Sequence, residues 1–193
     1  FTFPYMQDLQ AVFKNSNATR FFDNNNWDGQ LDSKYVSAPI PIDWNWGANK
    51  ANLYIKRDHN LDIQVEENEI TYTYEINVIN ESTSNTYPQG DYINYARIYI
   101  PSGAKILNIQ GIENNEYDIY NDSGYQVVGG WFNTPAGQNN TFVIRYRVPK
   151  STLGVNFPVS VQNDNIFFDL NIYKQPGTKK ESYVINIGYP SEW

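Results

Sequence analysis

The sequence predicts an all-β protein, an antiparallel immunoglobulin-like β-sandwich with a short N-terminal helical appendage. Apolar and polar residues alternate with a period of two in several segments after residue 51, which is the pattern of half-buried strands. Turn-forming clusters that contain Pro, Gly, Asp or Ser separate these segments. Aromatic residues make up 16% of the 193 residues and charged residues only 18%, a balance common in β-rich extracellular modules.

The first expected element is a helix within an N-terminal appendage. Residues 1–50 are predicted to form this appendage and to pack on a sandwich domain of residues 51–193. Residues 5–14 carry apolar side chains at helical spacing just behind a proline, which predicts one short helix. The Asn-Ser-Asn sequence at 15–17 predicts that this helix has ended.

Two loops are expected to follow the helix. Residues 23–29 are rich in Asn, Asp and Gly, which favour turns. Residues 36–41 contain Pro39 and Pro41, which can neither continue a helix nor sit in the middle of a sheet. We therefore predict that the appendage is mostly irregular after its helix.

The longest alternating segments predict the strands at the centre of the sandwich. In residues 70–78 the apolar side chains face one way while Thr, Glu and Asn face the other, and residues 142–148 and 166–172 repeat this pattern. Strands extending over 70–80 and 139–149 are expected to be central in their sheets. Shorter strands are expected near 52–65, 92–100, 105–112, 117–120, 125–132 and 182–188. Strands that follow one another without helices indicate an antiparallel sandwich.

Composition excludes several classes of function. The net charge is −7 and the 14 basic residues are scattered, so the chain offers no stripe that could follow a nucleic-acid backbone. The absence of cysteine removes thiol catalysis and thiolate metal sites. The single histidine, His59, is too little for a zinc cluster or for a supported catalytic triad. We therefore expect a protein that is not an enzyme and needs no cofactor.

Several short motifs resemble a known family. The Phe-Phe pair at 21–22 and the Trp-Asp-Gly at 27–29 precede the segment GANKANLYIKR at 47–57. This order resembles the C-terminal region of a family of large bacterial envelope proteins, catalogued as domain of unknown function family 4012. The resemblance continues through residues 90–103 and 129–132 and so spans most of the chain.

The resemblance implies an extracytoplasmic position behind an N-terminal membrane anchor, and it implies no established activity. The chain itself begins at Phe1 and contains no run near the roughly 18 apolar residues of a membrane-spanning helix. We therefore interpret it as a piece of a longer or processed polypeptide whose anchoring membrane segment lies outside this chain. Residues 42–46 depart from the family pattern, so a family site in that segment would not transfer.

A calcium site is one hypothesis for the Asn-rich loop. Asp23, Asn25 and Asp28, beside the turn at Gly29, could offer the carboxylate and carbonyl oxygens that calcium accepts in flexible geometry. The loop does not match an EF-hand, because Gly at the sixth position and Glu at the twelfth are missing. The alternative is a solvated turn that places Trp27 in a hydrophobic patch.

The sequence Asp-Trp-Asn-Trp at 43–46 admits two interpretations. In an extended segment Trp44 and Trp46 point to the same side and could form a small platform that stacks on sugars. The other interpretation is that the two rings close one end of the sandwich core and hold the appendage against it. The sequence favours closure of the core.

Together these features predict a non-catalytic extracellular structural or adhesion module of a bacterial cell-envelope protein, located at the cell surface, with another envelope protein as its partner. The alternative is a carbohydrate-binding module that holds a surface glycan through Trp44, Trp46 or Trp131. Self-association through the apolar residues 1–5 is left open.

Overall fold

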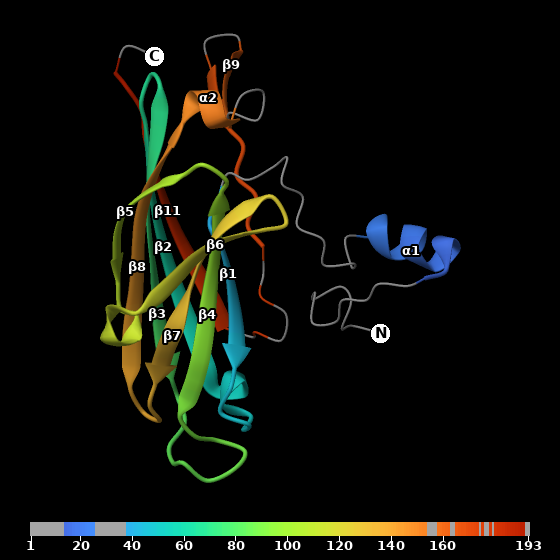
Figure 1. Ribbon diagram of the computed structural model, residues 1–193, viewed down its shortest axis with the longest axis vertical. Helices are drawn as coiled ribbons and strands as arrows, with labels where there is room; N and C mark the ends of the chain where they lie inside the picture. Colours follow the sequence, from blue (N-terminus) through green and yellow to red (C-terminus); the bar gives the residue numbers. More distant parts are fainter. Residues whose placement is uncertain are drawn as a thin grey trace.

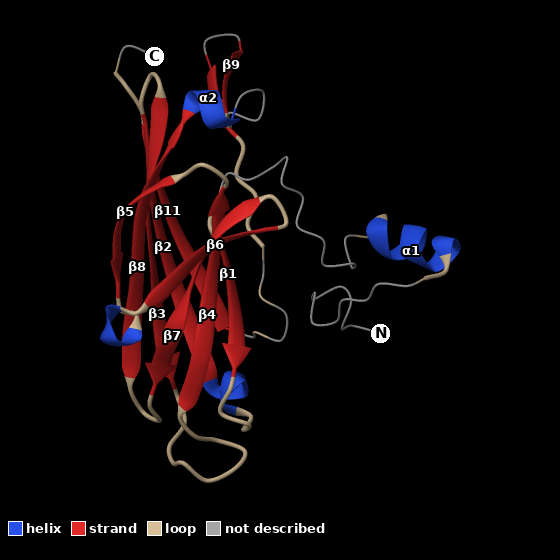
Figure 2. Cartoon of the chain, viewed as in Figure 1, coloured by secondary structure: helices blue, strands red, loops and turns tan. Residues whose placement is uncertain are grey.

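The computed structural model describes residues 14–25, 38–153, 158–162, 165–173, 175, 178 and 180–191. Strands dominate these residues and form two larger sheets that lie face to face, as Figure 1 and Figure 2 show. The predicted all-β class is confirmed. In the described part of the chain, no helix has the length and apolar character needed to cross a membrane.

One sheet has four strands in the order β1-β4-β7-β6, and all its neighbours are antiparallel. Its strands are β1 (Ile40–Asn45), β4 (Tyr92–Pro101), β6 (Tyr117–Asp122) and β7 (Tyr125–Thr134). The sequence predicted a loop over residues 36–41 because of Pro39 and Pro41, but in the structure Ile40 and Pro41 already belong to β1. In the structure β1 is an edge strand, where a proline removes no hydrogen bond that the sheet needs. The sandwich therefore begins before residue 51.

The other sheet has five strands in the order β11-β2-β3-β8-β5. Its strands are β2 (Ile55–Val65), β3 (Glu69–Asn80), β5 (Lys105–Gln110), β8 (Asn139–Pro149) and β11 (Lys180–Gly188). The predicted central strands, β3 and β8, do lie inside the sheet. The prediction of a purely antiparallel sandwich is wrong, because β11 pairs with β2 in parallel and makes this sheet mixed.

Both sheets contribute to one apolar core. Phe132 of β7 meets Phe142 of β8 edge to face, with ring centroids 6.3 Å apart. Tyr72 and Tyr146, on neighbouring strands of the five-stranded sheet, stack at 4.9 Å and are fully buried. Side chains at alternate positions of β3 and β8 fill this interior, as their period-two patterns predict.

Smaller elements complete the described chain. A hairpin of β9 (Val159–Gln162) and β10 (Asn165–Phe168) stands apart from the larger sheets, and the short helices are α2 (Lys150–Leu153), η2 (Ala51–Tyr54) and η3 (Glu113–Asn115). The alternating pattern at 166–172 predicted a strand of the main sandwich. In the structure this strand is β10, which ends at Phe168 and belongs to the separate hairpin.

The described part of the appendage contains the helix α1, which lies after the predicted segment. The predicted segment at 5–14 lies almost wholly outside the described residues, whereas α1 (Ser16–Asp23) forms where the sequence predicted a break. The reason is capping: the side chain of Asn15 accepts hydrogen bonds from the N–H groups of Asn17 and Ala18. Asn15 therefore begins a helix where the sequence predicted a break. No residue of α1 is buried.

Candidate functional site

Three aromatic residues stand side by side on the outer face of the four-stranded sheet. The register of the sheet pairs Trp44 of β1 with Tyr95 of β4, and Tyr95 in turn with Trp131 of β7. Directly paired residues of neighbouring strands project to the same side. Asp43 and Ala96, one residue along, lie on the inner face instead, so the three rings form a row across the sheet.

Trp46 joins this row from the chain just beyond β1. Its backbone N–H donates to the carbonyl of Ile93 at 2.7 Å. The centroid of its ring lies 4.8 Å from that of Trp44 and 6.2 Å from that of Trp131, both edge to face. Trp131 contacts Tyr95 at 5.3 Å in the same way. We call Trp44, Trp46, Tyr95 and Trp131 the aromatic patch.

The aromatic patch is open to solvent. Trp44 exposes 54% of its surface, Trp46 56% and Trp131 39%. The interpretation that Trp44 and Trp46 close the core is therefore wrong. Alternation correctly placed the two rings on one side of the strand, but that side is the outer one. The polar residues Asp43 and Asn45 take the inner positions instead.

Gly129 gives Tyr95 its place in the patch. Gly129 of β7 lies opposite Arg97 of β4. A Cβ added to Gly129 would stand only 2.7 Å from the hydroxyl oxygen of Tyr95. The tyrosine ring therefore lies over the backbone of β7, where a side chain would displace it. The hydroxyl donates to the carboxylate of Asp118 at 3.1 Å; burial and this hydrogen bond raise the pKa of Tyr95.

The other end of the same face is covered. Ile40, Tyr99, Tyr125 and Val127 form a second buried apolar cluster, and Tyr173 packs against it. The hydroxyl of Tyr99 donates to Asp122 at 2.8 Å, and burial together with this hydrogen bond raises the pKa of Tyr99 to about 12. The aromatic patch thus lies beside a packed part of the same face.

An ion pair lies under the patch, on the inner face of β1. Arg57 of β2 donates from Nε and Nη2 to Oδ2 of Asp43, and the hydroxyl of Tyr92 donates to the same oxygen at 3.1 Å. Asn94 donates to the other carboxylate oxygen at 3.0 Å. Burial opposes both charges, but mutual attraction and the hydrogen bonds outweigh it, so the pKa of Asp43 is lowered and that of Arg57 raised.

His59 is a packing residue of the interior. Its ring is 2% exposed, stacks on Tyr183 with centroids 4.2 Å apart, and has Nδ1 2.7 Å from the hydroxyl oxygen of Tyr74. Burial, followed by the nearby charge of Arg57, lowers the pKa of His59 to about 4.

The calcium hypothesis concerns residues that the structure describes only in part. Asp23 is the last residue of α1, and the amide nitrogen of Asn25 donates to the carbonyl of Phe21 at 2.7 Å, as a helix-end contact. Asp28 lies outside the described residues. Among the residues that are described, no group of three or more His, Cys, Asp or Glu side chains could hold a metal ion. Calcium binding by the loop stays a prediction.

Comparison with known proteins gives no assignment. No protein-family model and no curated protein matches the sequence. A crystal structure of a candidate nutrient-binding protein from Legionella pneumophila is similar over 58% of this chain and 42% of that one, with 8% sequence identity and a TM-score of 0.36. A likeness of that size carries no argument about fold or function, so the resemblance to the envelope family stays a prediction.

Proposed function

We propose that this chain is a non-catalytic interaction module that binds a partner through the aromatic patch. The observation that carries the proposal is the gathering of three half-exposed indoles and one tyrosine on one open face of a sheet. Trp and Tyr dominate the binding energy of protein interfaces, because they bury a large area with little loss of side-chain freedom. Contiguous exposed apolar surface of this kind marks binding sites.

The shape of the patch favours a protein partner. The three ring contacts described above are edge to face, with interplanar angles of 84° between Trp44 and Trp46 and 80° for each of the other two. The surface of the patch is therefore uneven and not a flat platform, which suits the irregular surface of a protein partner. We place the module outside the cytoplasm, in adhesion or assembly of a bacterial envelope protein, on the strength of the sequence resemblance.

Photo-crosslinking tests this function. A photoreactive phenylalanine analogue would be introduced at position 46 or 131 of the protein in the cells that produce it, and at position 189 as the control. Tyr189 is also exposed, at 57%, but lies outside the patch. We expect one protein to be crosslinked from positions 46 and 131 and not from 189. Identical products from all three positions would contradict the proposal.

Carbohydrate binding is the second candidate, and the exposure of the tryptophans favours it. Each indole leaves a large part of its surface free, and one sugar ring can stack on one indole face. A glycan array probed with the wild-type chain and with Trp46→Ala separates the two candidates. If a glycan binds the wild-type chain and not Trp46→Ala, the result would favour carbohydrate binding over a protein partner.

We also propose that the sandwich is of the immunoglobulin-like class. Two facing sheets of four and five strands around one core support this assignment. The parallel pairing of β11 with β2 is the feature that departs from a purely antiparallel arrangement. Comparison of an experimental structure with solved immunoglobulin-like domains, strand by strand, tests the assignment.

A further inference from the structure

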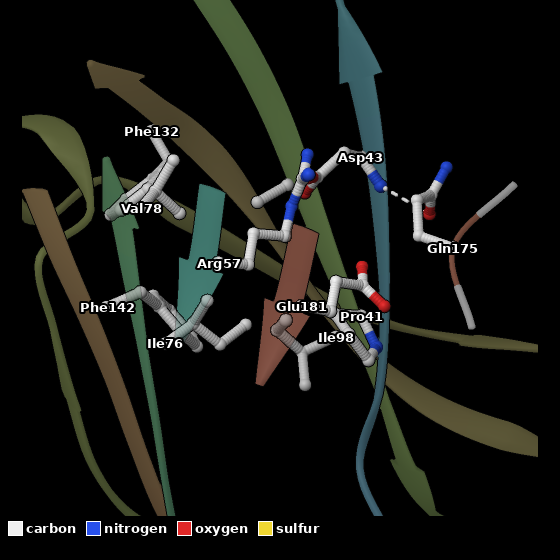
Figure 3. A pocket seen from close by; sticks show the side chains of 11 residues that line it. Pro41, Asp43, Arg57, Ile76, Val78, Ile98, Phe132, Phe142, Gln175 and Glu181 are labelled. Atoms are coloured by element: carbon white, nitrogen blue, oxygen red, sulfur yellow. Dashed lines mark hydrogen bonds and ion pairs between the residues drawn. The ribbon is translucent and has the colours of Figure 1, made fainter. Parts of the chain in front are cut away.

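A second site lies on the inner side of β1, where Arg57 borders two cavities. The smaller, of about 10 Å³, is largely apolar and contains Glu181 in its wall. Figure 3 shows this cavity, with Arg57 reaching from β2 toward Asp43 and Gln175 hydrogen-bonded to the backbone of Asp43. Its volume suits about one water molecule. The larger, of about 310 Å³, is polar, and we call it the Arg57 pocket.

The guanidinium of Arg57 has a donor left over. Nε and Nη2 are both engaged by Asp43, and Nη2 also donates to the hydroxyl oxygen of Tyr92 at 3.0 Å. Nη1 is buried and has no hydrogen-bond partner within the described residues. The side chain as a whole is only 3% exposed. A buried charged donor without a partner is costly, so this nitrogen indicates a missing acceptor.

Asp43 cannot be that acceptor. Its Oδ2 receives Arg57 and Tyr92, while its Oδ1 receives the amide of Asn94. These bonds fix the plane of the guanidinium from one side. They leave Nη1 as a positioned donor, which is the preorganisation expected of an arginine that holds an anion.

The rest of the Arg57 pocket offers few competing acceptors. The pocket is lined by Asn45, Asn49, Lys50, Asn52, Gln175 and Thr178 in addition to Asp43, Arg57 and Tyr92. The side-chain oxygens of Asn45 and Asn49 accept the backbone N–H groups of Gly47 and Ala51, which stabilises the turn. The side-chain oxygen of Gln175 accepts the N–H of Asp43 at 3.1 Å.

The charges of the lining side chains select the ligand. Arg57 and Lys50 each carry one positive charge and Asp43 carries one negative charge, so the wall of the Arg57 pocket has one net positive charge. In the described part of the chain Lys50 forms no ion pair. Glu181 borders only the smaller cavity, although its negative charge also acts on Arg57. A ligand with a single negative charge neutralises the pocket, whereas a dianion leaves an uncompensated buried charge.

We propose that the Arg57 pocket binds one carboxylate group, held by Nη1 of Arg57 and by the ammonium group of Lys50. The volume of the pocket lies at the lower end of the range for small-molecule sites. The carboxylate belongs either to an acidic sugar or to an acidic peptide side chain, which share this chemistry. The site is separate from the aromatic patch, on the opposite face of the same strand.

NMR of the ¹⁵N-labelled chain tests the proposal with defined probes. Acetate serves as the minimal carboxylate, glucuronate as the acidic sugar, and N-acetylglutamate α-amide as the acidic side chain. Sodium chloride at equal ionic strength and inorganic phosphate are the comparisons. We expect saturable shifts of the Arg57 side-chain resonance with acetate and tighter binding of one of the two larger acids, which identifies the source of the carboxylate.

Three variants assign the binding to the pocket. Arg57→Lys removes the free Nη1 donor and should weaken carboxylate binding roughly tenfold or more. Lys50→Gln removes one exposed charge without touching the core, and should weaken binding severalfold while the fold stays intact. Arg145→Lys changes an exposed arginine on β8 and should have no effect.

Each of the following results would overturn the inference. One is the absence of saturable shifts with all three acids while the spectrum of the wild-type chain shows an intact fold. The other is binding of phosphate in preference to the carboxylates, or carboxylate binding that Lys50→Gln leaves unchanged. The crosslinking experiment on the aromatic patch is independent of either result.

Discussion

Asp43 and Trp44 are consecutive residues of β1 that serve opposite faces of the same sheet. Asp43 is paired with buried Arg57 on the inner side, and Trp44 belongs to the exposed aromatic patch. Asn94 of β4 connects them: its amide nitrogen donates to Asp43 at 3.0 Å, and its amide oxygen accepts the backbone N–H of Trp44 at 2.9 Å. The edge strand that carries the patch is thereby fixed from beneath by the ion-pair network.

The two faces of β7 should differ sharply in their tolerance of alanine. Trp131 is exposed on the outer face, whereas its neighbour Phe132 is 2% exposed and packs in the core. We expect Trp131→Ala to change the free energy of unfolding by less than about 1 kcal/mol and Phe132→Ala to lower it by about 3–5 kcal/mol. Urea denaturation measures both. Equal losses would show that Trp131 is part of the core.

Gly129→Ala should move Tyr95 without unfolding the sheet. The added methyl group meets the far end of the tyrosine ring, which can swing away, so stability should change little. The hydrogen bond from Tyr95 to Asp118 should be lost and partner binding weakened. Tyr95→Phe is the matched control, because it removes the hydroxyl and keeps the ring over Gly129. Equal binding by Gly129→Ala and wild type would exclude Tyr95 from the contact surface.

Breaking the buried ion pair should be far more costly than breaking a surface pair. Arg57→Met leaves Asp43 buried without its counter-charge and should lower the free energy of unfolding by about 3–5 kcal/mol. Lys56→Met, which breaks the exposed pair with Asp58, should cost less than about 1 kcal/mol. Chemical denaturation at pH 7 compares the two variants.

A double variant isolates the interaction between Asp43 and Arg57. Asp43→Leu combined with Arg57→Met removes both charges together, so its cost should be smaller than the sum of the two single costs by more than about 1 kcal/mol. Strict additivity would mean that the two charges do not stabilise each other.

Stability should fall as the pH drops from about 6.5 to about 4 because of His59. Its pKa is about 4 in the folded protein against the ordinary value of 6.5 for histidine, so within this interval the unfolded state binds more protons than the folded state. The stabilisation is complete above the unfolded pKa and is lost as the pH falls toward the folded one. Its size is at most about 3 kcal/mol.

His59→Phe provides the control for this pH effect. Phenylalanine keeps a ring against Tyr183 but cannot titrate, so the slope of stability between pH 4 and pH 6.5 should shrink. Asp43 acts at lower pH: because its pKa is lowered in the folded state, its contribution is present above the unfolded value of 3.8 and is lost below it. An unchanged slope in His59→Phe would contradict the assignment to His59.

The sequence predicted the central strands well because their pattern is local. Alternation in β3 and β8 identifies both the strand and its buried face, since one side of each strand packs into the core. The direction of β11 was not predictable in the same way. Whether an edge strand pairs in parallel depends on the path of the preceding chain, which leaves no periodic signal in the strand.

The candidate site was only half visible in the sequence. Alternation put Trp44 and Trp46 on one side but could not say which side faces solvent, because that depends on the neighbouring strands. Tyr95 was missed, since its role follows from its register with Trp131 and from the missing side chain of Gly129. The ion pair between Arg57 and Asp43 connects the two sheets. A contact between residues of different sheets leaves no local pattern in the sequence, so it could not be predicted.

The most direct test of the aromatic patch is titration calorimetry. It measures the affinity of this chain for the protein that crosslinking identifies, or for the glycan that the array identifies. The wild type is compared with the triple variant Trp44→Ala, Trp46→Ala and Trp131→Ala, after circular dichroism and NMR have shown that both are folded. We predict that the triple variant binds roughly a hundredfold more weakly or not at all. An affinity within about twofold of the wild type would contradict the claim that the aromatic patch is the binding surface.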